Sequence, residues 1–79
     1  KSSIVKLTGR EKDCLYWSAQ GKTAGEVADI LGLKTETIRK YIKNAMKRLN
    51  ARSKTQAVVK AMEFGVLDIG ISHPRINNR

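Results

Sequence analysis

The sequence predicts an all-α fold, a compact domain of four short helices. Three capping boxes, in which Ser or Thr stands three residues before Glu or Gln, each precede a stretch with helical apolar spacing. These boxes are Thr8–Glu11, Thr23–Glu26 and Ser53–Gln56. Glycines follow those stretches, and no alternation of apolar and polar residues indicates a strand. We expect the helices to end near Gly21, Gly32, Leu49 and Gly65.

Length and composition limit what the chain can be. Its 79 residues make one small domain, and 41% hydrophobic residues are typical of a folded chain. No apolar run approaches the roughly 18 residues of a membrane span, and no leader peptide is visible. One cysteine, Cys14, and one histidine, His73, are too few for a disulfide framework or a four-ligand zinc site. We therefore expect no membrane contact, no metal and no cofactor.

The positive charge is concentrated in one stretch. The net charge is +9, and residues 34–54 hold eight basic residues against Glu36 alone. Such a charge makes a nucleic acid the first partner to suspect. A run of charges is also typical of a solvated helix face, so the helical geometry has to decide between these two interpretations.

The second and third predicted helices are separated by only about three residues, Gly32–Lys34. A short helix, a tight turn with glycine and a longer helix form the helix-turn-helix pattern, although hairpins that bind nothing share it. The third helix is expected over about 35–49. On a helical wheel of residues 38–49 it has a buried stripe of Ile38, Ile42, Ala45 and Leu49, flanked by Tyr41 and Met46. The opposite face carries Arg39, Lys40, Lys43 and Lys47. Like charges four residues apart repel, and a polyanion would relieve that repulsion.

This face suits double-stranded DNA. The start of the second helix of a helix-turn-helix reaches base edges in the major groove, which predicts base contacts for Arg39, Lys40 and Lys43. Basic side chains farther along, and hydroxyls at helix starts, suit phosphates. The predicted phosphate contacts are Thr23, Lys34, Thr35, Thr37, Lys47 and Arg48.

Other reactive side chains have structural interpretations. Glu11 faces inward and needs a backbone or basic partner, whereas Cys14 is expected in the core. Tyr16 and Trp17 are assigned to packing. No catalytic triad, carboxylate pair or phosphate-binding glycine loop is visible, so the sequence does not predict an enzyme.

Several short motifs lie along residues 7–67. They are LTxRE at Leu7–Glu11, GKT at Gly21–Thr23, EVAxIL at Glu26–Leu31, TI at Thr37–Ile38, NAMKRL at Asn44–Leu49 and QAV at Gln56–Val58. Together they resemble the C-terminal DNA-binding domain of LuxR-type transcriptional regulators. Trp17, GKT and QAV resemble the quorum-sensing branch of that family more than its phosphorelay branch.

The resemblance implies a compact four-helix domain containing a helix-turn-helix that binds an inverted repeat as a homodimer. It implies pairing of protomers through the fourth helix, with Ala57, Ala61 and Met62 as predicted interface residues. It assigns residues 1–6 to a linker from an upstream domain absent from this chain, and residues 68–79 to a flexible tail. That upstream domain would sense a small-molecule signal such as an acyl-homoserine lactone. RNA polymerase is a further expected partner, and the bacterial cytoplasm, at the nucleoid, is the expected location.

Two positions depart from the family pattern. Lys34 stands where Ser or Thr usually caps the third helix, and we expect Thr35 to take over that cap. Gly25 stands where bulkier residues are usual. Two alternative functions remain at this point. One is a protein-interaction module that inhibits a related regulator through the fourth helix, and the other is RNA or non-specific nucleic-acid binding.

Overall fold

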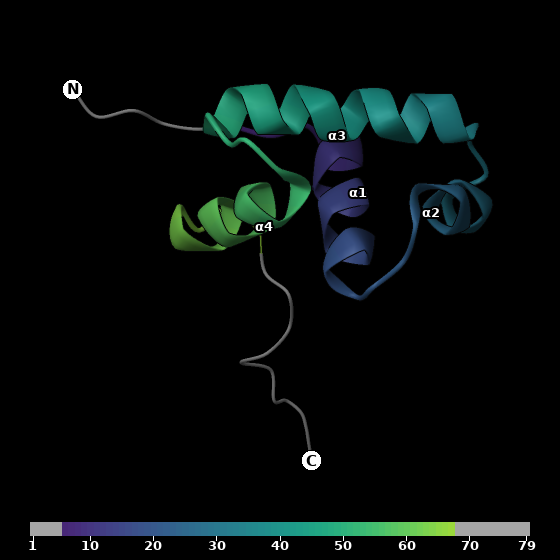
Figure 1. Ribbon diagram of the computed structural model, residues 1–79, viewed down its shortest axis with the longest axis horizontal. Coiled ribbons are helices and arrows are strands. Elements are labelled where there is room, and N and C mark those ends of the chain that lie inside the picture. Colours follow the sequence, from purple (N-terminus) through teal and green to yellow (C-terminus); the bar gives the residue numbers. More distant parts are fainter. Residues whose placement is uncertain (1–5, 68–79) are drawn as a thin grey trace, which may run out of the picture.

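The computed structural model describes residues 6–67, which form four helices (Figure 1). These are α1 (Gly9–Ala19), α2 (Ala24–Leu31), α3 (Thr35–Leu49) and α4 (Lys54–Glu63). No strand occurs in this part of the chain, and the predicted all-α class is confirmed. The linker proposed up to residue 6, apart from Lys6 itself, and the tail proposed for 68–79, with His73, lie outside the described residues.

Capping boxes start α1 and α2 as predicted. The Thr8 N–H donates to Glu11 Oε1 at 3.0 Å, and the Glu11 N–H donates to Thr8 Oγ1 at 3.2 Å. The box at the start of α2 has the same pair of bonds. The predicted box at α4 is incomplete. Ser53 Oγ accepts from the Gln56 N–H, but the Gln56 side chain accepts from the N–H of Arg52 instead of that of Ser53.

Each helix is closed by a residue with a positive φ, and these residues are Gly21, Gly32, Asn50 and Gly65. The N–H of the next residue then donates back to the carbonyl five residues earlier, as from Leu33 to Ala28 at 2.9 Å. Asn50, with φ of 55°, performs this role without being glycine. The helix ends therefore fall close to the predicted positions, although α4 ends at Glu63, before Gly65.

The core consists of two clusters that share α1 and α3. The first cluster joins α1, α3 and α4 through Leu7, Leu15, Ala45, Leu49, Ala57, Ala61 and Leu67. The second joins α1, α2 and α3 through Cys14, Val27, Ala28, Ile38 and Ile42. Helix α3 packs against all three other helices, whereas α2 and α4 do not pack against each other. The predicted stripe of α3 is confirmed, with its first half in the second cluster and its last half in the first.

The side chains assigned to packing are in the core or at its edge. Cys14 exposes no surface, and burial raises the pKa of its thiol to about 11, so the thiol stays protonated at neutral pH. Tyr16 packs against the first cluster and Trp17 against the second. Their rings meet edge to face, with centroids 5.1 Å apart. These contacts confirm the structural interpretation of all three residues.

Glu11 is the one charged residue buried within the described part of the chain. One carboxylate oxygen accepts the Thr8 N–H, and the other accepts from Arg48 Nε at 3.2 Å. The predicted backbone and basic partners of Glu11 are thus confirmed. This ion pair fixes the start of α1 against the end of α3.

Replacing Glu11 with Ala should destabilise the fold by about 2–3 kcal/mol, because it removes a cap and a buried ion-pair partner together. The matched control is Glu26→Ala, which breaks the same kind of box at an exposed site and should cost less. Urea denaturation of both variants would measure the difference. Equal losses would show that the Arg48 contact and burial add nothing to the cap.

Candidate nucleic-acid interface

The turn between α2 and α3 is held by backbone geometry and by one apolar contact. Gly32 takes the left-handed conformation with φ of 71°, where a side chain would be strained. The next residue, Leu33, is half-buried and packs against the second cluster. The turn therefore has a fixed shape, and it sets the direction in which α3 leaves α2.

The outer face of α3 is exposed and positively charged. Figure 1 shows the other three helices on one side of α3, which leaves its opposite side uncovered. The side chains of Arg39, Lys40, Lys43 and Lys47 are all exposed there. Among residues 6–67 none of these four forms an ion pair; the pairs present are Arg10–Asp13 and Arg48–Glu11. The four cations therefore face solvent outside any ion pair of the described residues and create a positive potential along the helix.

Two hydroxyls predicted to contact phosphate lie close together. A methyl group added at Gly25 would lie 3.9 Å from Thr23 Oγ1 and 4.0 Å from Thr35 Oγ1, so the starts of α2 and α3 are adjacent. Thr23 Oγ1 also accepts the Glu26 N–H as part of its cap. Thr37 is half-buried in the first turn of α3. The distances of 3.9 and 4.0 Å from a methyl group at Gly25 are ordinary van der Waals separations. The space around residue 25 would therefore admit a side chain, and crowding does not explain the glycine there.

The two basic residues at the end of α3 have different surroundings. Lys47 is exposed and belongs to the outer face. Arg48 is about half exposed, and its Nε is already engaged by Glu11. The structure thus gives Arg48 a role in holding α1 against α3, which the sequence did not reveal.

The start of α3 differs from the expectation. Thr35 is the first helical residue, and Lys34 occupies the capping position without any side-chain hydrogen bond. The prediction that Thr35 replaces Lys34 as the cap is therefore wrong. The extended Lys34 backbone already places its carbonyl to accept the Ile38 N–H at 3.1 Å, which begins the helix at Thr35. A lysine side chain has no acceptor atom to offer the first N–H groups.

The predicted dimer residues need a correction. Ala57 and Ala61 have no exposed surface, because they are the small residues that let α4 approach the first cluster. They cannot contact another molecule. Met62 is 37% exposed and Val59 42%.

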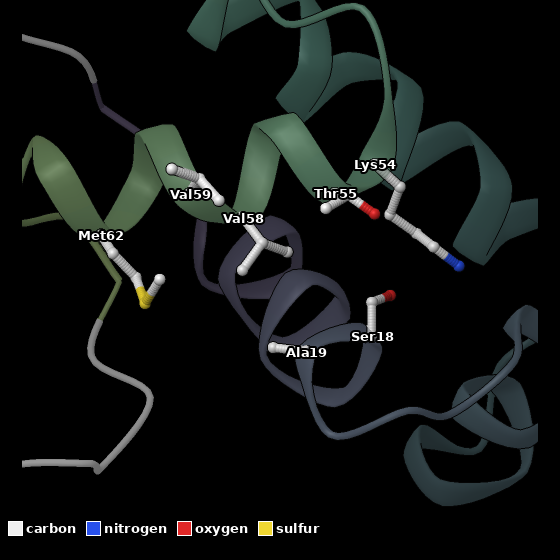
Figure 2. Close-up of a pocket in the computed structure, with 7 residues that line it drawn as sticks. All are labelled: Ser18, Ala19, Lys54, Thr55, Val58, Val59 and Met62. Carbon is white, nitrogen blue, oxygen red and sulfur yellow. The ribbon is translucent and has the colours of Figure 1, made fainter.

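The free side of α4 borders a groove instead (Figure 2). Its lining residues are Ser18 and Ala19 of α1 with Lys54, Thr55, Val58, Val59 and Met62 of α4. The buried Oγ of Ser18 has no hydrogen-bond partner among the described residues. Thr55 and Val59 were not among the residues predicted for this helix face, although their spacing with Met62 by four and then three residues places all three on one side of a helix.

No helix within 6–67 is long and apolar enough to cross a membrane. In that range, no three His, Cys, Asp or Glu side chains come together where they could hold a metal ion.

Comparison with known proteins identifies the family. Residues 5–61 match the family described as "Bacterial regulatory proteins, luxR family". The chain belongs to the luxR family. Curated relatives include the quorum sensing-dependent transcriptional regulator VjbR of Brucella ovis, 46% identical over 80% of this chain and 24% of its own. Another is the transcriptional activator AnoR of Acinetobacter nosocomialis, 41% identical over 77% of this chain and 26% of its own. The chain thus spans about a quarter of the length of these relatives.

Solved luxR-family structures have the same fold. The transcription factor GerE superposes with a TM-score of 0.76 over 86% of this chain and 98% of its own, at 24% identity. The DNA-free dimer of the LuxR-type receptor VqmA from Vibrio cholerae superposes with a TM-score of 0.71, at 29% identity. That match covers 81% of this chain and 30% of VqmA. The family match thus makes this chain a luxR-family domain, and the two curated relatives named above are described as transcriptional regulators.

The uncapped start of α3 gives a stability prediction. Lys34→Ser supplies a capping oxygen and removes a cation from the positive end of the helix dipole, which should stabilise the fold by about 1 kcal/mol. Thermal denaturation would measure this gain, with Lys40→Ser in the middle of α3 as the control for loss of charge. No gain over that control would mean that the first N–H groups of α3 need no acceptor.

Proposed function

We propose that this domain binds double-stranded DNA sequence-specifically, with α3 in the major groove. The observation that carries the proposal is the outer face of α3. Its four cations are exposed, and none of them forms an ion pair with another described residue. The major groove accepts one helix, and its guanines offer the O6 and N7 acceptors that Arg and Lys bind. Arg39, Lys40 and Lys43 are the proposed base contacts, because they lie in the first half of α3.

Phosphate contacts would surround this face. Lys47 lies one turn beyond Lys43 and is exposed. Thr23 and Thr35 stand at the adjacent starts of α2 and α3, where backbone N–H groups also favour an anion. The remaining proposed phosphate contacts are Lys34, Thr37 and Arg48. The Lys34 side chain does not cap α3, and its positive charge is unfavourable at the positive end of the helix dipole. A DNA phosphate bound beside Lys34 would offset that unfavourable charge.

Dimerisation is proposed through the outer side of α4. Thr55, Val59 and Met62 replace Ala57 and Ala61 as interface residues, because the two alanines are buried in the domain itself. Packing α4 against its copy in a second protomer would cover the exposed Val59 and Met62. A two-fold dimer presents two copies of α3, and the matching DNA site is an inverted repeat.

The rest of the regulator is proposed from the relatives. VjbR is described as quorum sensing-dependent and AnoR as a transcriptional activator, and both are about four times as long as the matched region. We infer an upstream domain that responds to a small molecule, a contact with RNA polymerase during activation, and action at the nucleoid in the cytoplasm. A module that only inhibits a related regulator through α4 would leave the cationic face of α3 without a use.

Base readout predicts a specific effect of Arg39→Ala. Selection from a randomised duplex library at moderate and high salt should enrich an inverted repeat with the unchanged protein. Arg39→Ala should lose about 1–3 kcal/mol on that site and relax the preference at one position in each half-site. Lys47→Ala is the matched control, since it should weaken binding to all sequences and reduce the slope of log affinity against log salt by about one.

A uniform loss for Arg39→Ala would make Arg39 a phosphate contact. Weak binding of the unchanged protein, without enrichment and lost at high salt, would leave only non-specific electrostatic binding.

The α4 interface predicts that Val59→Lys reduces cooperative binding to the two half-sites while leaving affinity for a single half-site unchanged. The buried charge would oppose pairing of two protomers. Phe64→Lys is the control, because Phe64 is 53% exposed but does not line the groove. Gel-shift titrations on one and two half-sites would measure both effects, and unchanged cooperativity in Val59→Lys would exclude this interface.

A further inference from the structure

Glu36 is the one acidic residue of α3, and it lies in the first turn. Its side chain is exposed. Its spacing of four, seven and eleven residues from Lys40, Lys43 and Lys47 places it on the same outer face, at the end nearest the turn. A wheel drawn from residue 38 omits it, and for this reason the sequence pattern of the face looks purely basic.

The carboxylate of Glu36 has no partner in the described part of the chain. It takes part in no hydrogen bond and no ion pair there, although Arg39 and Lys40 follow it by three and four residues. A carboxylate on a surface that approaches phosphates is repelled by them. Its presence at this position is therefore costly for DNA binding unless a group on the DNA donates to it.

The edges of the bases limit which group that is. In the major groove guanine presents the acceptors O6 and N7, and thymine presents O4, so both repel a carboxylate. Adenine places its N7 acceptor beside its amino group, whereas cytosine presents the N4 amino donor. Cytosine is thus the base that best matches a carboxylate.

We propose that Glu36 is a specificity-determining residue, whose carboxylate accepts a hydrogen bond from the N4 amino group of a cytosine in each half-site. This inference rests on the proposed docking of α3 in the major groove. Glu36 lies at the start of α3, ahead of Lys40 and Lys43 on the same face. We therefore expect Glu36 to contact a different base pair from the ones that Lys40 and Lys43 contact.

A competing role for Glu36 is purely structural. An acidic residue in the first turn interacts favourably with the helix dipole, and α3 lacks a side-chain cap. That role predicts lower thermal stability on removal of the carboxylate, with no change of base preference at any position.

The test is selection from a randomised duplex library with the unchanged chain, Glu36→Gln and Glu36→Ala. The unchanged chain should enrich cytosine at one position of each half-site. Glu36→Gln should shift that position to adenine, because a glutamine amide matches the N6 and N7 of adenine. Glu36→Ala should lose the preference there by about tenfold and keep the preferences at the other positions. Both variants should bind non-specific DNA more tightly, since a repulsive charge is gone.

Glu63→Gln is the matched control, because Glu63 is an exposed glutamate at the end of α4. It should leave every base preference unchanged. If the unchanged chain enriches a site and both Glu36 variants select the same site, the inference is overturned while the proposed function stands. If the unchanged chain enriches no sequence, the proposed function itself fails, and the inference fails with it.

Discussion

The buried stripe of α3 is the constraint on which the rest of this structure depends. Helices α2 and α4 do not pack against each other, and both clusters of the core draw on α3 and α1. Ile38 and Ile42 fix α3 against α2, while Ala45 and Leu49 fix it against α4. These contacts set the rotation of α3 about its own axis. The same rotation decides that Arg39, Lys40, Lys43 and Lys47 face outward, so core packing and the proposed DNA contact cannot vary independently.

Stability and the proposed binding surface make opposite demands on α3. Its cations repel one another along one face, and its first turn has a lysine where a cap would stabilise it. The stabilising contacts lie elsewhere, in the boxes that start α1 and α2 and in the Glu11–Arg48 pair. Arg48 connects the two demands, because it stands next to the basic face but uses its Nε to hold α1. Such a division is expected where a surface is shaped for a charged partner.

Helix α4 shows why periodicity alone was insufficient. Its apolar and small residues lie on more than one side, and the pattern does not say which side packs inward. The structure turns Ala57 and Ala61 toward α1 and α3, because small side chains allow close approach of the helices. Val59 and Met62 are left on the groove side. The predicted dimer residues therefore included two that belong to the core, whereas Thr55 and Val59, which were not among them, border the groove.

The sequence by itself determined the four helices, their ends, the inner stripe of α3 and the basic face opposite to it. These features follow from local spacing and from capping residues, which act over three to five positions along the chain. Only the tertiary structure decided that Glu11 pairs with Arg48, which of the α4 side chains are buried, and that Lys34 leaves α3 without a side-chain cap. Those outcomes depend on which helix packs against which, or on the backbone path of a turn. Residues far apart in the chain meet there, and spacing along the sequence does not encode such meetings.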